Sequence, residues 1–154
     1  MSTFSNDLIG SIFADALKEV ISTTTGFSFE ISSQEYDSGF EEMTGLMSLN
    51  GNNHGMVFIS ADETAMLRIC SFMTGLHDNE ITVKDVEDAL CELVNMTAGS
   101  AKIRFNTTDD EYSLSPPFVL RGNNMSIITK KRVNVISMTL GNGEISIKLK
   151  VVFY

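Results

Sequence analysis

The chain has few of the residues from which nucleic-acid sites, disulfides and metal centres are built. Its 154 residues include 11 Lys+Arg against 20 Asp+Glu, for a net charge of −9 at pH 7, and only 2 cysteines. The one basic run, at residues 130–132, is expected to be a solvated bend, so binding to a phosphate backbone is not expected. Cys70 and Cys91 both fall in expected helices and are interpreted as partly or fully buried thiols, not as a disulfide or a metal site.

The sequence also lacks the usual signatures of a self-contained active site. There is no Gly-rich phosphate loop, no Gly-x-Ser-x-Gly and no His-Glu-x-x-His. Residues 109–111 are three adjacent carboxylates, which in a loop are usually solvated charge and offer no octahedral set of ligands. No secretory signal begins the chain and no apolar run approaches a membrane span, so we expect a cytoplasmic protein with no membrane segment. A catalytic role would therefore need a substrate that brings its own nucleophile or metal.

Length and periodicity predict one α+β domain over residues 1–154. A composition of 43% hydrophobic and 20% charged residues is ordinary for a globular protein, and a chain of this length buries about two-thirds of its unfolded surface. Helical spacing predicts helices over residues 5–23, 65–73 and 83–104. Alternation predicts strands over residues 27–32, 42–49, 55–60, 118–121, 126–129, 133–140 and 145–153. We expect a mostly antiparallel sheet of about six strands with the long helices packed on it.

Turn and cap signals indicate where these elements meet. Residues 50–55 are rich in Asn and Gly and predict a hairpin, and Asn142–Gly143 is a strong type I′ hairpin signal. Thr82 and Asp85 are expected to cap the start of the helix that follows them. In the last strand, Lys148 and Lys150 are expected to point outward, where they could blunt an exposed sheet edge.

The helix over residues 83–104 carries a narrow polar stripe opposite its apolar side. Asp88, Glu92, Asn95 and Gly99 are spaced by four, three and four residues, so at about 100° per residue they lie on one side. The other side holds Val86, Ala89, Leu90, Leu93, Val94 and Ala101. The simplest interpretation is the solvent face of an amphipathic helix.

Two residues of the stripe are unusual for a solvent face. Such positions usually hold Lys, Glu, Gln or Ala, whereas Asn95 is a middling helix former and Gly99 costs about 1 kcal/mol relative to Ala. A glycine on the exposed side does not serve core packing, but it would let another molecule approach the helix closely. These features favour a binding or catalytic role for the stripe.

The same frame occurs once earlier in the chain. From Asp15 to Gly26, the types Asp, Ala, Leu, Glu, Thr and Gly coincide with those of the frame from Asp88 to Gly99. The chain therefore looks like two diverged halves, each headed by such a helix. The first copy keeps Glu19 but has Ser22 where the second has Asn95, so if Asn is the working group only the second copy is active.

This pattern resembles that of the CheC/CheX/FliY family of chemotaxis phosphatases, and the order of segments is similar to that of the CheX-like branch. The resemblance rests on Asp88, Glu92 and Asn95 in the form Asp-x-x-x-Glu-x-x-Asn, on Gly99, and on Pro117. The interval between Asn95 and Pro117 is one residue shorter than is usual in the family, which a shorter loop would explain. The resemblance implies the same α+β layout, with two pseudo-symmetric halves.

The resemblance also implies a function and a set of partners. The family's substrate class is the aspartyl phosphate of a CheY-like response regulator, which itself holds the Mg²⁺, so the chain is expected to carry no cofactor of its own. Catalysis would then fall to Glu92 and Asn95: Asn95 would orient the attacking water, and Glu92 would pair with the regulator's active-site lysine. Asp88, Gly99 and Pro117 are expected to take part in binding. CheX-like members tend to form homodimers, which an exposed sheet edge would permit.

Two other interpretations stay open at the level of sequence. The stripe could dock a response regulator, or a receptor or flagellar-switch component, as a non-catalytic adaptor. Alternatively, the match could reflect the fold alone. The intact pair Glu92 and Asn95, beside the altered pair Glu19 and Ser22, favours the catalytic interpretation.

Overall fold

The computed structural model describes residues 5–51, 54–105, 112–129 and 133–154. Along the chain its elements are α1 (Asn6–Thr25), β1 (Glu30–Ser33), β2 (Met43–Asn50), β3 (His54–Ala61), α2 (Glu63–Thr74), a 3-10 turn η1 (Asp78–Glu80), α3 (Val83–Phe105), β4 (Ser113–Leu114), β5 (Phe118–Arg121), β6 (Asn134–Gly141) and β7 (Ser146–Phe153). All three helices and both hairpins occur where the sequence predicted them, whereas β1 begins later than expected and β4 was not anticipated. The acidic and basic runs at residues 109–111 and 130–132 lie outside the described residues.

The strands form one seven-stranded sheet in which every pairing is antiparallel. Their order is β1-β6-β7-β3-β2-β4, and β5 pairs with β2 on the same side as β4. If β1, β2 and β3 are exchanged with β5, β6 and β7, the order β1-β6-β7-β3-β2-β5 is simply reversed. The α+β class and the two pseudo-symmetric halves are therefore confirmed, with the pseudo-twofold axis between β3 and β7.

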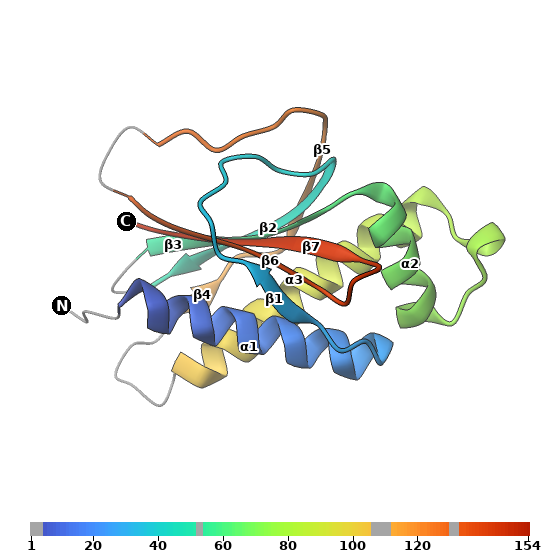
Figure 1. Ribbon diagram of the computed structural model, residues 1–154, viewed down its shortest axis with the longest axis horizontal. Coiled ribbons are helices and arrows are strands. Elements are labelled where there is room, and N and C mark those ends of the chain that lie inside the picture. Colours follow the sequence, from blue (N-terminus) through green and yellow to red (C-terminus); the bar gives the residue numbers. More distant parts are fainter. Residues whose placement is uncertain (1–4, 52–53, 106–111, 130–132) are drawn as a thin grey trace.

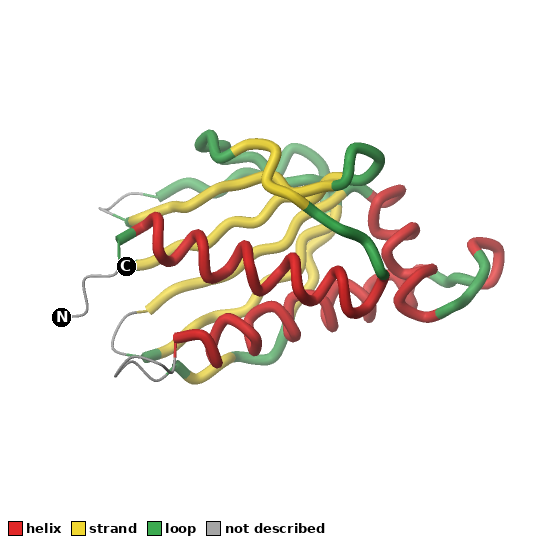
Figure 2. The backbone as a smooth tube through the Cα atoms, turned by 60° about the horizontal axis from the view of Figure 1, so that its bottom comes forward, coloured by secondary structure: helices red, strands yellow, loops and turns green. Residues whose placement is uncertain are grey.

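Helices α1 and α3 lie side by side on one face of this sheet, and α2 lies near one end of it (Figure 1). Figure 2 shows the two long helices side by side, and the colours of Figure 1 show that they run in opposite directions. Phe13 of α1 therefore meets Phe105 at the end of α3, with ring centroids 5.8 Å apart. Gly45 of β2 lets α3 pack closely, because a Cβ there would lie 3.0 Å from Cγ of Leu90. The helices and this face of the sheet enclose the hydrophobic core.

Two long connections cover the other face of the sheet. Residues 34–42 and 122–129 run past each other there, joined by a bridge between Gly39 and Ser126 and by a 2.9 Å hydrogen bond from the Phe40 N–H to the Met125 carbonyl (Figure 1). The strand predicted over residues 126–129 is therefore wrong, because this segment makes only that isolated bridge. Its partner segment comes from the other half of the chain, which local alternation does not reveal.

The lysines of β7 face this second side of the sheet but do not lie at an edge. β7 is paired on both sides, with β3 and β6, so the interpretation of an exposed edge is wrong. Lys150 is only 1% exposed: its Nζ donates to the Asp37 carbonyl and lies 5.4 Å from the centre of the Phe40 ring. Lys148 pairs with the Asp37 carboxylate at 2.8 Å. Alternation identified the face correctly, but residues 34–42 cover it.

The hairpin between β6 and β7 is confirmed, although its turn differs from the predicted type. Gly143 has a φ of 91°, but Asn142 does not share it, since Asn124 is the only non-glycine residue with a positive φ among the described residues. A type I′ turn needs positive φ at both central positions. Instead, the Asn142 side chain accepts a hydrogen bond from the Ile145 N–H at 2.9 Å and closes a longer loop.

Candidate functional site

The motif helix α3 begins with the predicted capping pair. The Thr82 hydroxyl accepts from the Asp85 N–H at 3.2 Å, and the Asp85 carboxylate accepts from the Thr82 N–H at 2.8 Å. This reciprocal arrangement satisfies two backbone donors that a helix start leaves unpaired. The bond from Thr82 also holds the pKa of the Asp85 carboxyl below its usual range. The helix that carries the stripe therefore has a fixed beginning.

The polar stripe lies on the side of α3 that faces away from the core, as predicted. Asp88, Glu92 and Asn95 are exposed and Gly99 is half-buried. The buried side of the helix is formed by Val86, Ala89, Leu90, Leu93, Val94, Thr97, Ala98, Ala101 and Phe105. Every predicted stripe residue is thus accessible to another molecule along a single helical face.

The two central polar side chains of the stripe are uncommitted within the protein. In the described part of the chain, neither Glu92 nor Asn95 makes a side-chain hydrogen bond or ion pair. Asp88 differs, because its carboxylate pairs with Lys84, one helical turn earlier, at 3.2 Å. A carboxylate and a carboxamide one turn apart are therefore accessible to a second molecule.

Gly99 has no evident role in the fold of this chain. It lies inside α3 with an ordinary helical backbone, and a Cβ built on it would meet no atom within 4 Å. Neither backbone geometry nor close packing therefore requires a glycine here, although glycine weakens a helix interior. The open space beside Gly99 continues the accessible face formed by Asn95 and Glu92.

Pro117 lies on the segment that returns along α3. The Tyr112 ring is 5.5 Å from the Phe105 ring near the end of the helix, and Arg121 pairs with Glu87 near its beginning at 3.3 Å. Tyr112 to Arg121 covers about 30 Å as an extended chain, and Glu87 to Phe105 rises about 27 Å as a helix. The two segments therefore span similar distances, and Pro117 lies roughly level with residue 95 along the helix axis.

The first copy of the frame is also exposed, but it is altered in two ways. Asp15, Glu19 and Ser22 all face solvent on α1. The Glu19 carboxylate is held by Arg104 of α3, whereas its counterpart in the second copy is uncommitted. In addition, Gly26 has a φ of 78° and ends α1 as its C-cap, so no helix continues beyond it. The first copy therefore differs from the second in three ways: Glu19 is ion-paired, the helix ends at Gly26, and Ser22 replaces the asparagine.

The charged cluster at the start of α3 was not anticipated from the sequence. Arg121, at the end of β5, reaches both Glu87 of α3 and Glu63 of α2. A single arginine at a strand end carries no local signal of such a contact, because its partners are distant along the chain. This cluster lies next to the stripe, since Glu87 directly precedes Asp88.

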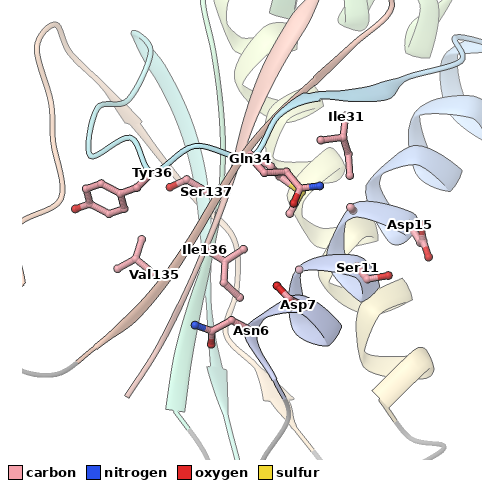
Figure 3. Close-up of a pocket in the computed structure, with 13 residues that line it drawn as sticks. Asn6, Asp7, Ser11, Asp15, Ile31, Gln34, Tyr36, Val135, Ile136 and Ser137 are labelled. Atoms are coloured by element: carbon pink, nitrogen blue, oxygen red, sulfur yellow. The ribbon is translucent and has the colours of Figure 1, made fainter.

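One cavity of about 400 Å³ lies beside α1, away from the stripe of α3. It opens between α1 and the edge of β6, with Asp7, Ser11 and Asp15 on the helix side and Tyr36 and Val135 on the other (Figure 3). No residue of α3 lines it. It is therefore separate from the stripe that the sequence singles out.

The other reactive side chains in the described part of the chain form no second centre. Cys70 is buried and Cys91 half-buried, both are free, and burial raises the pKa of each thiol, which disfavours a reactive thiolate. No cluster of three or more His, Cys, Asp or Glu suited to a metal ion occurs among the residues that the structure describes. In the same residues, no helix combines the length and apolar character needed to cross a membrane.

Comparison with known proteins agrees with the observed fold. A chain described as "CheY-P phosphatase CheX" from Thermotoga maritima is 26% identical over 124 residues, covering 79% of this chain and 77% of that one. The crystal structure of the chemotaxis protein CheX from Vibrio vulnificus superimposes with a TM-score of 0.83 at 21% identity, covering 95% of this chain and 99% of that one. The CheX-CheY-BeF3-Mg²⁺ complex from Borrelia burgdorferi gives a TM-score of 0.80 at 19% identity, covering 93% and 96%.

The match to a family model covers the part of the chain that holds the stripe. The model described as "Chemotaxis phosphatase CheX" matches residues 43–140, which include Glu92, Asn95 and Pro117. This range is more than half of the chain and leaves out α1 with its altered frame. The chain therefore belongs to the CheX family of chemotaxis phosphatases.

Proposed function

We propose that this protein accelerates hydrolysis of the aspartyl phosphate of a CheY-like response regulator. The observation that carries the proposal is the pair Glu92 and Asn95, exposed one turn apart on α3 with no partner among the described residues. Membership of the CheX family supports it, as do a relative named as a CheY-P phosphatase and a similar structure that is a complex of CheX with CheY.

Asn95 is proposed to orient the attacking water. A carboxamide donates and accepts hydrogen bonds at the same time, so it can hold a water in line with phosphorus, as a glutamine does in some GTPases. Because the Asn95 side chain is not engaged within the protein, it can enter the regulator's active site without breaking an internal hydrogen bond. Positioning of this kind lowers a barrier by fixing geometry rather than by supplying a new reactive group.

Glu92 is proposed to dock on the active-site lysine of the regulator. It lies one turn before Asn95 on the same face, so an ion pair there would set how far the carboxamide reaches. Asp88 would contribute at the rim of the contact, where it is already partly neutralised by Lys84. The docking pair would therefore act on geometry, with its strength dependent on ionic strength.

Gly99 and Pro117 are proposed to shape the two sides of the contact. The open space at Gly99 would let the regulator's backbone approach α3. Pro117, roughly level with residue 95 on the neighbouring segment, would limit how that segment can move beside the carboxamide. Both residues would act through the fit of the contact and not through a chemical step.

The substrate would supply the remaining chemistry. The Mg²⁺ would come with the phosphorylated regulator, so the reaction would need no cofactor bound by this chain. Response regulators of this kind work in the cytoplasm, which is where we place the protein. A homodimer would be compatible with this function, because the stripe is complete within one chain.

The α1 copy is proposed to be inactive. A serine at position 22 has a shorter reach than an asparagine and no fixed donor and acceptor pair. Its companion Glu19 is held by Arg104 and is not free to bind a regulator lysine. One active face per chain follows.

The proposal is tested by the lifetime of the phosphorylated regulators of the same genome, with and without this protein. Asn95→Ala should reduce the stimulated rate about a hundredfold, equivalent to about 2.7 kcal/mol of barrier, and should leave the fold intact because Asn95 is exposed. Ser22→Ala, an equally exposed change in the α1 copy, serves as the control and should not alter the rate.

Two outcomes would contradict the proposal. If Asn95→Ala keeps the full stimulated rate, the assignment of the water-orienting group is wrong. If phosphate lifetimes do not change at all but the phosphorylated regulator still binds, the protein is a non-catalytic adaptor that uses the same stripe for docking.

A further inference from the structure

The short strand β5 contributes little to the hydrophobic core. Its backbone pairs with β2 from Phe118 to Arg121, and of its four residues Val119 is the one that packs against the core. Pro117 directly precedes this strand, so the position of β5 sets the position of Pro117, which is roughly level with Asn95 along the axis of α3. Whatever fixes β5 against the helix therefore bears on the proposed site.

We propose that Arg121 is a positioning residue that holds β5, and with it Pro117, in register with the Asn95 stripe of α3. Its Nη1 lies 3.3 Å from Glu87 Oε1 on α3, and its Nη2 lies 3.6 Å from Glu63 Oε1 at the start of α2. One guanidinium thus joins three elements. This inference rests on the proposed function for its effect on catalysis, whereas the restraint on β5 can be tested without it.

The chemistry of the contact suits an arginine. Two different nitrogens of a planar guanidinium reach two carboxylates on different helices, whereas a lysine offers a single charged nitrogen. Arg121 and Glu87 are each 38% exposed in their side chains, so the contact is partly shielded from water. Partly buried pairs are screened by salt less than fully exposed ones.

Neighbouring hydrogen bonds give the contact a rigid frame on one side. The Glu42 carbonyl accepts from the Gly122 N–H at 3.0 Å, directly after Arg121. The Glu42 carboxylate accepts from the Glu63 N–H, at the first residue of α2. The end of β5 and the start of α2 are therefore fixed to the same residue, and the ion pair with Glu87 extends this frame to α3.

The ion pair between Arg121 and Glu87 can affect the stripe because Glu87 lies next to it. Glu87 directly precedes Asp88, and β5 runs back along α3 from this point toward the level of Asn95. A strand anchored at this end by Arg121 and held at its middle by Val119 keeps a constant distance from the helix. Without the ion pair, small shifts of β5 would displace Pro117. A displacement of about 1 Å at a catalytic contact can lower the rate up to about a hundredfold.

The other half of the molecule offers a matched control. There Lys18 of α1 pairs with Glu30 of β1 at 3.2 Å, which is again an ion pair between a long helix and a short outer strand. This half carries Ser22 in place of the asparagine, so loss of its ion pair should not affect the proposed reaction. Lys18→Ala is therefore the control for Arg121→Ala.

The first experiment measures stimulated dephosphorylation over a range of regulator concentrations up to saturation for Arg121→Ala, Glu87→Ala, the double variant and Arg121→Lys. We expect each single alanine variant to lower kcat about fivefold with little change in KM, the double variant to be no worse than either, and Arg121→Lys to recover part of the loss. Lys18→Ala should match the wild-type protein. Melting temperatures should change little, because ion pairs of this exposure stabilise a fold weakly.

The comparison of the two single variants separates positioning from direct contact with the regulator. If Arg121 itself touched the regulator, Glu87→Ala would leave its charge free and would retain activity. Full activity of Glu87→Ala beside a weakened Arg121→Ala, additive losses in the double variant, or wild-type activity of Arg121→Ala would each overturn the inference.

A second measurement does not depend on phosphatase activity. Amide hydrogen exchange should be faster at β5 in Arg121→Ala and Glu87→Ala than in the wild-type protein, and unchanged at β5 in Lys18→Ala. Unaltered exchange at β5 in both variants would show that Arg121 does not restrain the strand. Should the wild-type protein fail to act on any regulator, the proposed function falls while this exchange result still decides the role of Arg121.

Discussion

Replacing Gly99 by alanine should stabilise the protein and weaken its function at the same time. The Cβ of the new alanine would meet no atom within 4 Å, and Gly99 already has a helical backbone, so the substitution introduces no strain. Alanine is favoured over glycine inside a helix by about 1 kcal/mol. For a domain of this size that corresponds to an increase in melting temperature of about 3 °C.

The loss of function would come from the same methyl group. If the regulator's backbone approaches α3 at Gly99, a methyl placed in a close contact costs about 1–3 kcal/mol. We therefore expect kcat/KM for stimulated dephosphorylation to fall at least about fivefold, while the free energy of unfolding rises. Opposite shifts in these two quantities are the signature of a glycine kept for a partner and not for the fold.

Gly10→Ala is the matched control for this experiment. Gly10 also lies inside a long helix, but its Cβ would come within 3.2 Å of Ile136 and Met138, so it should gain less stability, and it should not change activity. Chemical denaturation and a phosphate-release assay on the same preparations measure both quantities. A Gly99→Ala protein with raised stability and unchanged activity would refute the role in close approach, and lowered stability would refute the interpretation of an open helix position.

Three further predictions concern other parts of the molecule. Burial lowers the pKa of Lys150, so at this residue the unfolded chain binds more protons and Lys150 contributes a rise in stability as the pH approaches about 10.4. The stability of the wild-type protein relative to Lys150→Met should therefore increase with pH in this range, as measured by denaturation curves. The hydrogen bond from Lys148 lowers the pKa of Asp37, so this carboxylate should stabilise the fold above about pH 4 and lose that contribution in more acidic solution. In Asp37→Asn the free energy of unfolding should therefore fall less steeply at acid pH, by a difference of less than about 1 kcal/mol. Ser22→Asn, introduced into a chain whose α3 copy has been inactivated, should restore no phosphatase activity, because Glu19 stays in its ion pair; a clear recovery of rate would contradict this.

The parts of the structure that could be predicted from sequence are those with local repeating signals. The helices α1 and α3 follow from apolar spacing over about five or six turns, and the stripe of Glu92 and Asn95 follows from the same period. The capping pair Thr82 and Asp85 follows from a spacing of three residues. In each case the interacting groups lie within a few turns of each other, so the sequence contains both partners in one window.

The parts that could not be predicted depend on partners from the other half of the chain. Lys150 alternates with core residues as a solvent-facing lysine would, and only the crossing of residues 34–42 shows that it is covered. The ion pair of Arg121 with Glu87 likewise joins residues far apart along the chain. The two-residue strand β4 is too short to display a period at all.

The palindromic strand order allows the surface residues of the two halves to diverge independently. Each half contributes its helix and strands to a shared interior, while its stripe faces solvent and belongs to no core contact. A duplicated unit can therefore change the residues of one solvent-facing stripe without any loss of folding, as the difference between Ser22 and Asn95 illustrates. For protein engineering, the outer face of α1 is thus a ready scaffold on which a second recognition surface could be installed without repacking the interior.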